Sequence, residues 1–151
     1  SGPRHLVFSP NGRYAYLMNE LSGKVIVYSY SDGKLKELQS IAADNANAGG
    51  GADIHVSPDG MFVYASTRLK GDGITIFRVG NKGTLTRVGA QLTGKHPRNF
   101  AITPNGNFLL VACRDDNSIQ VYSRDKDTGL LKNTHQDIVL SHPVCVKFYP
   151  E

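Results

Sequence analysis

Four prolines recur along the chain at nearly equal spacing. They stand at Pro10, Pro58, Pro104 and Pro150, and the intervals between them are 48, 46 and 46 residues. The first three open the same kind of turn, in which Asn-Gly or Asp-Gly follows the proline. An internal period of this length is the mark of a repeat architecture, in which each repeat is one supersecondary unit that stacks on its neighbours. The period therefore limits the fold to a repeating array before any single side chain is considered.

Each repeat contains four short segments that are typical of strands. They are rich in aromatic and β-branched residues and are bounded by Pro, Asn, Asp and Gly. The Asn-Gly or Asp-Gly pair supplies the positive φ angles of a tight hairpin, so the first two strands are antiparallel neighbours. The expected strands are 6–8, 14–17, 24–28 and 35–41 in the first repeat, 54–56, 62–65, 74–77 and 85–92 in the second, and 100–102, 108–111, 119–122 and 130–139 in the third.

Four antiparallel strands in a repeat of about 47 residues predict a blade of a β-propeller, which makes the fold class all-β. A plain β-sandwich with the same number of strands is the alternative, but turns that recur in phase favour the propeller. The expected units are blades at about 3–41, 52–92 and 97–139, and an extra first strand, the hub strand, at 143–150. The segment 42–51, rich in Ala, Asn and Gly, is expected to be a flexible loop at the rim.

Three blades cannot close a ring, since propellers use roughly four to eight. The hub strand at 143–150 also needs three partner strands, which the N-terminal segment of a longer chain would supply. Residues 1–151 are therefore predicted to be the C-terminal part of a longer, single propeller domain, with the missing N-terminal blades as partner. Because blade faces and an edge strand are exposed in the chain alone, it is also expected to associate with itself.

The composition limits the kinds of partner. The net charge of +4 is modest and the Lys and Arg residues are not clustered, so no nucleic-acid partner is expected. No apolar stretch is long enough to cross a membrane and no signal peptide is visible. These observations predict a cytoplasmic protein without a membrane partner, and export stays open because the true N-terminus is expected to be missing.

Cysteine and histidine usage gives no metal signal. Cys113 and Cys145 both fall in expected strands and are interpreted as buried thiols, not as a disulfide or a metal pair. No cluster of His, Cys and Asp has the spacing of metal ligands, so neither a metal nor another cofactor is expected.

Aligning the repeats at their prolines shows where they differ. The position four residues before the proline is apolar in every repeat, as expected for the core. The two positions before that one vary, and they hold Arg4 and His5, Ala52 and Asp53, Arg98 and Asn99, and Val144 and Cys145. A second set, ten residues after the proline, holds Glu20, Arg68 and Arg114. Because the second strand runs antiparallel to the first, both sets are expected to converge at the mouth of the central channel.

Several cations with a few carboxylates in a concave site suit a small anionic ligand. The planar guanidinium of arginine binds a carboxylate or a phosphate through two parallel hydrogen bonds. A carboxylate that lies among arginines has a lowered pKa, so it stays ionised and available as a base. An ion-pair network that lines a wet channel is an equally good interpretation of the same residues. His55 falls in the apolar register of its strand and is a secondary candidate, whereas His96, His135 and His142 give no functional signal.

At these residues the chain resembles the seven-bladed lactonase propellers, the family of the bacterial propeller-type 6-phosphogluconolactonases and the fungal 3-carboxy-cis,cis-muconate lactonizing enzymes. The resemblance covers essentially the whole chain and is most specific at Gly-Pro-Arg-His, residues 2–5, and Asn-Glu-Leu, residues 19–21. The segments 8–16, 52–60 and 97–100 continue the match in order. The family also ends in a lone hub strand that its N-terminus completes.

The resemblance implies that Arg4, Arg98 and Glu20 are catalytic, together with a histidine from an earlier blade that this chain does not contain. It implies a metal-independent lactonase acting on a small anionic sugar lactone such as 6-phosphogluconolactone, or the related muconate lactonizing reaction. Arg4 and Arg98 would bind the phosphate or carboxylate and stabilise the oxyanion, and Glu20 would orient or deprotonate water. The residues expected to bind substrate are His5, Asp53, Arg68, His55 and Asn99.

A non-catalytic propeller, of the kind found in scaffold and surface-layer proteins, is the alternative. The segment 16–19 partly resembles the second strands of such proteins. Glu20 and the two arginines argue against it, since a scaffold has no reason to break the repeat symmetry at those positions. If the protein is a lactonase, residues 1–151 alone are expected to be inactive.

Overall fold

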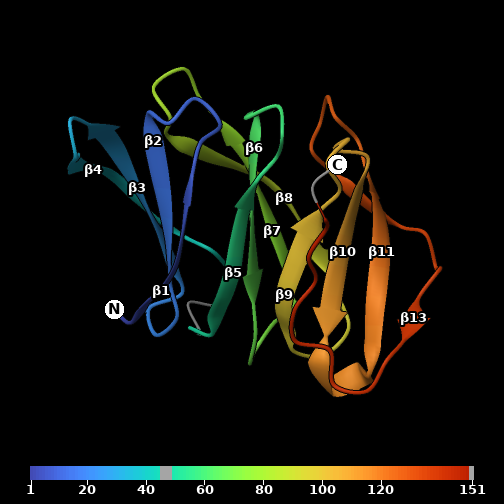
Figure 1. Cartoon of the computed structure of the whole chain (residues 1–151). Helices are drawn as coiled ribbons and strands as arrows, with labels where there is room; N and C mark the ends of the chain where they lie inside the picture. Colours follow the sequence, from blue (N-terminus) through green and yellow to red (C-terminus); the bar gives the residue numbers. More distant parts are fainter. Residues whose placement is uncertain (45–48, 150–151) are drawn as a thin grey trace.

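Three antiparallel sheets follow one another along the chain. The computed structural model describes residues 1–44 and 49–149, and Figure 1 shows the sheets standing side by side. The first sheet contains β1 (Pro3–Phe8), β2 (Tyr14–Asn19), β3 (Lys24–Ser31) and β4 (Lys34–Ala42), the second contains β5 (Gly51–Val56), β6 (Phe62–Thr67), β7 (Gly73–Val79) and β8 (Leu85–Leu92), and the third contains β9 (Pro97–Ile102), β10 (Phe108–Cys113), β11 (Ser118–Arg124), β12 (Leu131–Asn133) and β13 (Ile138–Val139). A short 3₁₀ turn, η1 (Arg114–Asp116), joins β10 to β11.

Strands that are adjacent in sequence are hydrogen-bonded neighbours in each sheet. The first strands also lie next to one another across the sheets, because β5 contacts both β1 and β9. This is the arrangement of propeller blades around a hub. The predicted all-β class and the repeated four-stranded antiparallel unit are therefore confirmed.

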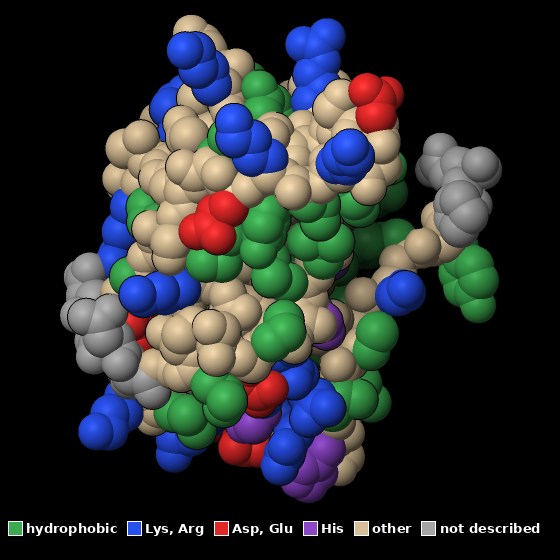
Figure 2. Space-filling view, turned by 90° about the vertical axis from the view of Figure 1, so that its left-hand side faces the viewer, with side chains coloured by type: hydrophobic (Ala, Val, Ile, Leu, Met, Phe, Trp, Pro, Cys, Tyr) green, Lys and Arg blue, Asp and Glu red, His purple; other side chains and the backbone are tan. Residues whose placement is uncertain are grey.

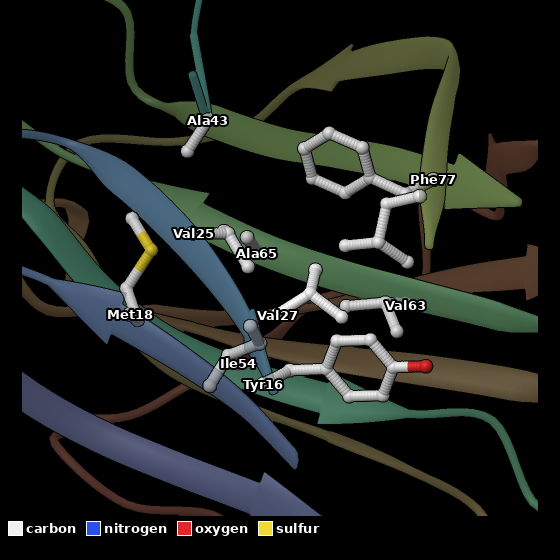
Figure 3. Close-up of a cluster of buried hydrophobic side chains, with 10 residues drawn as sticks. Tyr16, Met18, Val25, Val27, Ala43, Ile54, Val63, Ala65 and Phe77 are labelled. Atoms are coloured by element: carbon white, nitrogen blue, oxygen red, sulfur yellow. The ribbon is translucent and has the colours of Figure 1, made fainter. Parts of the chain in front are cut away.

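Two apolar cores hold neighbouring sheets together. The core between the first and second sheets includes Tyr16, Ile54 and Phe77, all of them buried (Figure 3). The core between the second and third sheets includes Phe62 and Phe100, also buried. Each core therefore draws its side chains from two repeats, which is why a single repeat cannot bury its own apolar face.

A repeated tyrosine ties each sheet to the next. The Tyr16 hydroxyl donates to the Gly83 carbonyl at 2.9 Å, and the Tyr64 hydroxyl donates to the Gly129 carbonyl at 2.7 Å. Both glycines lie between the third and fourth strands of their repeat with φ angles of 78° and 76°. A Cβ atom at either position would collide with an aromatic ring of the preceding sheet. The third repeat has Leu110 where the first two have the tyrosine.

The prediction of a single fourth strand in the third repeat is wrong in detail. Instead of one strand over 130–139, two short strands, β12 and β13, pair with β11. The amide and the hydroxyl of Thr134 both bond to the Val121 carbonyl, at 3.0 and 2.8 Å. His135 then adopts a positive φ of 57°, which turns the chain away from the ladder.

The expected hub strand at 143–150 is not formed in its described part, 143–149. A strand needs the backbone of a neighbour, whereas here the Val146 amide donates to the side-chain oxygen of Asn99 at 2.7 Å. This segment, the C-terminal segment below, runs beside the third sheet (Figure 1). Residue 150 lies outside the described residues, as do 45–48 of the loop expected at 42–51.

The prediction for the two cysteines is confirmed at Cys113 and wrong at Cys145. Cys113 ends β10 and is buried, and burial raises the pKa of its thiol to about 12. Cys145 is exposed because the C-terminal segment lies on the surface and not inside a sheet. Both are free thiols.

Candidate active site

A hollow of about 410 Å³ opens where the first strands of the three sheets begin. Its lining comes from β1, β5, β9 and the C-terminal segment. The lining residues are Arg4, His5, Asp53, His55, Arg98, Asn99, Val144, Cys145 and Lys147. The structure thus gathers around one space most of the residues that the alignment of the prolines singled out. Figure 2 shows Lys and Arg, acidic and His side chains gathered at the lower end of the molecule, where β1 begins in Figure 1.

Strand irregularities turn these side chains toward the hollow. In a regular strand consecutive side chains point to opposite faces, so Arg4 and His5 could not both line one space. The pairing of β1 with β2 shifts between Pro3 and His5, which leaves Arg4 as an extra residue. The pairing of β9 with β10 shifts in the same way at Arg98, and β5 shifts within 51–54. A bulge of this kind bends the strand and re-aims a side chain, and here it recurs at the site in every repeat.

Asp53 anchors one side of the hollow and joins all three sheets. Its residue is 3% exposed, and its carboxylate accepts hydrogen bonds from β1, β5 and β9. The donors to Oδ1 are His5 Nδ1 at 2.8 Å and the Ile54 amide at 2.9 Å, and the donors to Oδ2 are His55 Nε2 at 2.9 Å, Asn99 Nδ2 at 2.7 Å and the Phe100 amide at 3.2 Å.

These donors keep the Asp53 carboxyl ionised. Burial alone would raise its pKa. The hydrogen bond and charge of His55, the Phe100 amide and the hydrogen bond from His5 outweigh burial, so the pKa of Asp53 lies below its ordinary value. The buried Asp53 carboxylate therefore holds the imidazole rings of His5 and His55 at the edge of the hollow by hydrogen bonds.

Glu20 forms the second charged group and is shared between two arginines. Its Oε2 accepts from Arg4 Nη1 at 3.3 Å and its Oε1 accepts from Arg68 Nη2 at 2.6 Å. Arg4 is fixed further by a bond from Nε to the Ala52 carbonyl at 2.9 Å. Of these three charged residues only Arg4 is among the described lining residues of the hollow. Glu20 and Arg68, both predicted site residues, therefore reach the hollow only through Arg4.

Two arginines determine the charge state of Glu20. Partial burial raises its pKa, but the hydrogen bond from Arg68 and the positive charges of Arg4 and Arg68 lower it further than burial raises it. The pKa of Glu20 consequently lies below its ordinary value, and the side chain is a carboxylate at neutral pH.

The described end of the segment 42–51 holds this ion-pair group in place. The Gly50 amide donates to the Glu20 carbonyl at 2.7 Å, and the Arg68 amide donates to the Gly50 carbonyl at 2.8 Å. Gly50 has a φ of 76°, and a Cβ atom there would collide with the Arg68 carbonyl. Only glycine combines this positive φ with the close approach to the Arg68 backbone. The glycine at this position, which contributed to the prediction of a flexible loop, therefore allows close backbone packing.

Sequence reasoning missed His96, which lies beside the ion-pair group. Its Nε2 is 3.2 Å from Arg68 Nη1, and its Nδ1 is 3.5 Å from a carboxylate oxygen of Asp115. Burial and the charge of Arg68 lower the pKa of His96, so the neutral ring accepts the Arg68 hydrogen bond. A signal was available: His96 stands eight residues before its proline with a φ of 58°, where Gly2 and Gly50 stand in the first two repeats with 67° and 76° and His142 stands before Pro150 with 44°. A non-glycine residue in this conformation is uncommon and suggests a role for its side chain.

Arg98 differs from the other site arginines. It lines the hollow, yet across residues 1–44 and 49–149 its guanidinium makes no hydrogen bond or ion pair. Lys147, which sequence reasoning also missed, lines the same space from the C-terminal segment. Arg114, by contrast, pairs with Asp115 within η1 at 3.2 Å. The hollow is therefore lined by cationic groups whose charges are not all balanced by ion pairs among the described residues.

The geometry defines a propeller-like protein whose sheets share a hollow lined by Arg4, Arg98 and Lys147. In the described residues no group of three or more His, Cys, Asp or Glu side chains is arranged to hold a metal ion. The chain matches the family described as "Lactonase, 7-bladed beta-propeller" over residues 1–148. It therefore belongs to the lactonase β-propeller family.

Named relatives and solved structures agree with this assignment. The 6-phosphogluconolactonase of Formosa agariphila is 47% identical over 146 residues, which are 93% of this chain and 41% of the relative. The 6-phosphogluconolactonase of Bacillus subtilis is 36% identical over 98% of this chain and 44% of its own length. The structure of the periplasmic gluconolactonase PpgL of Pseudomonas aeruginosa superimposes with a TM-score of 0.92 and 35% identity, over 99% of this chain and 43% of that one.

A crystal structure from Bacteroides uniformis, provisionally assigned as a 6-phosphogluconolactonase, superimposes with a TM-score of 0.97 and 65% identity. It covers 99% of this chain and 44% of that chain. The chain thus spans less than half the length of the relatives and structures it matches.

Proposed function

We propose that the protein to which this chain belongs is a lactonase that hydrolyses a small anionic sugar lactone such as 6-phosphogluconolactone. The relatives named for this activity support the reaction class. The observation on this chain that supports it most is that Arg4, Arg98 and Lys147 line one hollow of about 410 Å³. Cations on several walls of one small space suit a substrate that is anionic at one end and gains negative charge at its carbonyl during attack.

Arg4 and Arg98 take the roles of binding the anion and stabilising the oxyanion. They come from different sheets and line the same hollow, which supports their contact with one small ligand. Asn99, His5 and His55 border the same space and complete the polar wall. Arg68 acts through Glu20, because it does not reach the hollow within the described chain but holds the carboxylate that pairs with Arg4.

The muconate lactonizing reaction also needs arginines around an anion, but the relatives reported above are named for hydrolysis. Hydrolysis is therefore the favoured reaction. The scaffold alternative is not favoured either, because bulged strands, a carboxylate with five donors and an arginine that has no partner among the described residues meet at one hollow, as in a binding site.

The remaining expectations concern the whole protein. We propose that further blades complete a seven-bladed ring with residues 1–151 in its C-terminal part, and that the isolated chain is inactive and associates with itself. No helix among the described residues is long and apolar enough to span a membrane. The cytoplasmic location stays a prediction, and one of the solved structures is of a periplasmic protein.

The test uses the full-length protein with 6-phosphogluconolactone. Hydrolysis is followed by the proton released, with the spontaneous rate subtracted. We expect clear acceleration, which Glu20→Gln lowers because Arg4 loses its charged partner. Glu37→Gln is the matched control, since Glu37 is an exposed carboxylate on β4. A wild-type rate equal to the spontaneous rate, on this and on other anionic sugar lactones, would refute the proposed function.

A further inference from the structure

The two histidines of the hollow have defined proton positions. An ionised carboxylate only accepts hydrogen bonds, so each imidazole nitrogen that faces Asp53 must bear a hydrogen. These nitrogens are Nδ1 of His5, 2.8 Å from Oδ1, and Nε2 of His55, 2.9 Å from Oδ2. His5 therefore keeps Nε2, and His55 keeps Nδ1, as the nitrogen that is able to accept a second proton. A carboxylate that orients an imidazole in this way makes it an effective general base.

The two rings are not equally placed. The His55 ring packs edge-on against the Phe100 ring, with centroids 4.8 Å apart, and this contact restricts its movement. His5 follows the bulged Arg4 in β1, and its side chain is 42% exposed against 37% for His55, so the contact with Phe100 and not the exposure distinguishes the two rings. A ring that is open to the hollow on one edge and held by a carboxylate on the other is better placed to reach a substrate.

Glu20 is poorly suited to move a proton. Both of its carboxylate oxygens are engaged by arginines, at 3.3 Å from Arg4 and 2.6 Å from Arg68. These contacts favour the ionised form and therefore weaken the carboxylate as a base. The described part of the chain also places Glu20 outside the lining of the hollow. Its geometry fits a group that holds Arg4 in position.

We propose that His5, oriented by Asp53, moves the proton in the lactone hydrolysis proposed above, and that Glu20 is a positioning residue for Arg4. This inference rests on the proposed function. Nε2 of His5 takes a proton from water as the water oxygen bonds to the lactone carbonyl carbon, and the arginines balance the oxyanion that forms. The bond between that carbon and the ring oxygen then breaks, and the same proton passes from Nε2 to the departing oxygen. One water is consumed, and the product is the open-chain hydroxy acid.

The charged and titratable groups around His5 come from every element that borders the hollow. They are Arg4 of β1, Asp53 and His55 of β5, Arg98 of β9, and Cys145 and Lys147 of the C-terminal segment. A pH profile must therefore be compared between variants and not read from the wild type alone.

The experiment compares His5→Gln, Glu20→Gln and a control in the full-length protein. His135→Gln is the control, because His135 is an exposed histidine in a turn of the third repeat. We expect His5→Gln to lower kcat by roughly 10²–10⁴-fold with a smaller change in KM, and to abolish the acidic limb of the kcat/KM profile. Glu20→Gln should lower activity but keep that limb, and His135→Gln should match the wild type.

Two results would overturn the inference while the proposed function stands. One is an active wild type whose His5→Gln variant keeps kcat within about threefold. The other is loss of the acidic limb in Glu20→Gln and its retention in His5→Gln. An inactive wild type would instead overturn the proposed function.

A spectroscopic measurement gives a result even where a variant fails to fold. Long-range ¹H–¹⁵N spectra of the wild-type protein distinguish the two imidazole tautomers. We expect the neutral His5 ring to bear its hydrogen on Nδ1 and the neutral His55 ring on Nε2, as their contacts with Asp53 require. A neutral His5 ring with its hydrogen on Nε2 would have no nitrogen free to take a proton from water at the hollow, and would refute the proposal.

Discussion

Arg98 permits a test of ligand binding that is almost free of effects on folding. Its guanidinium lines the hollow and, among the residues that the structure describes, has no hydrogen-bond or ion-pair partner to lose. Arg98 is only partly buried, and substitution where no such contact is lost usually changes stability by about 0.5 kcal/mol or less. Arg4 lacks this advantage, because removing it also breaks its bonds to Glu20 and to the Ala52 carbonyl.

The expected loss of activity follows from the hydrogen bonds that Arg98 would make to the substrate. A hydrogen bond to a charged group contributes about 1.5–3 kcal/mol. Since about 1.4 kcal/mol corresponds to a factor of ten, Arg98→Gln should lower kcat/KM by roughly 10- to 150-fold. Arg98→Lys should recover only part of this loss, because an ammonium keeps the charge but not the two-pronged geometry.

The assay measures kcat/KM for 6-phosphogluconolactone in the full-length protein, together with the free energy of unfolding in urea. Arg13→Gln is the matched control, since Arg13 is an exposed arginine in the turn that precedes β2. Activity of Arg98→Gln within twofold of the wild type would refute the assigned role. A large loss of stability would show instead that Arg98 has a structural partner.

Three further predictions concern stability and assembly. Tyr64→Phe removes a hydroxyl that donates to the Gly129 carbonyl and accepts from Arg124 Nε. We expect a loss of roughly 1–3 kcal/mol in urea unfolding and a smaller loss for Tyr16→Phe, whose hydroxyl has one such bond; equal losses would contradict this. Because the pKa of Asp53 is lower in the folded state, its contribution to stability is complete above about pH 4 and is lost as the pH falls through the folded-state pKa. Asp53→Asn should remove that part of the acid dependence, and an unchanged pH dependence of the unfolding free energy would speak against it. Finally, residues 1–151 alone should sediment as oligomers at high concentration and show no lactonase activity, and a clean monomer with measurable turnover would be contrary to both expectations.

The proline period predicted the backbone well because each repeat imposes the same sequence of strands and turns. Eleven of the twelve expected strands in the three repeats are present as single strands, and the exception is the broken fourth strand of the third repeat. The same period placed Arg4, Asp53 and Arg98 at one end of neighbouring strands, and the structure brings them to one hollow. Equivalent residues of successive repeats occupy equivalent places in the fold, so an alignment of the repeats predicts where each residue lies.

Side-chain pairing could not be recovered in this way. The register shifts of β1 and β9 decide which neighbours face the hollow, and the sequence contains no separate mark for them. Glu20 was expected at the channel mouth, but two arginines hold it outside the lining that the structure describes. Lys147 was missed because the C-terminal segment was treated as a strand whose role was to close the ring. These are outcomes of contacts between repeats, which the period within one repeat does not specify.

The contacts between repeats also explain why the site cannot belong to a single blade. One chain of contacts runs from Asp115 through His96, Arg68 and Glu20 to Arg4, and it crosses from the third sheet through the second to the first. A second chain runs from Val146 through Asn99 and Asp53 to His5, with His55 attached at Asp53, and it crosses the same sheets. The two chains end on consecutive residues, Arg4 and His5, which face one space only because β1 is bulged between them. His96 holds a left-handed conformation, at a cost of roughly 1–3 kcal/mol, at a position where Gly2 and Gly50 stand in the first two repeats and His142 stands before Pro150. In this conformation Nε2 of His96 lies 3.2 Å from Nη1 of Arg68, so His96 helps to orient Arg68 and, through Glu20, also Arg4.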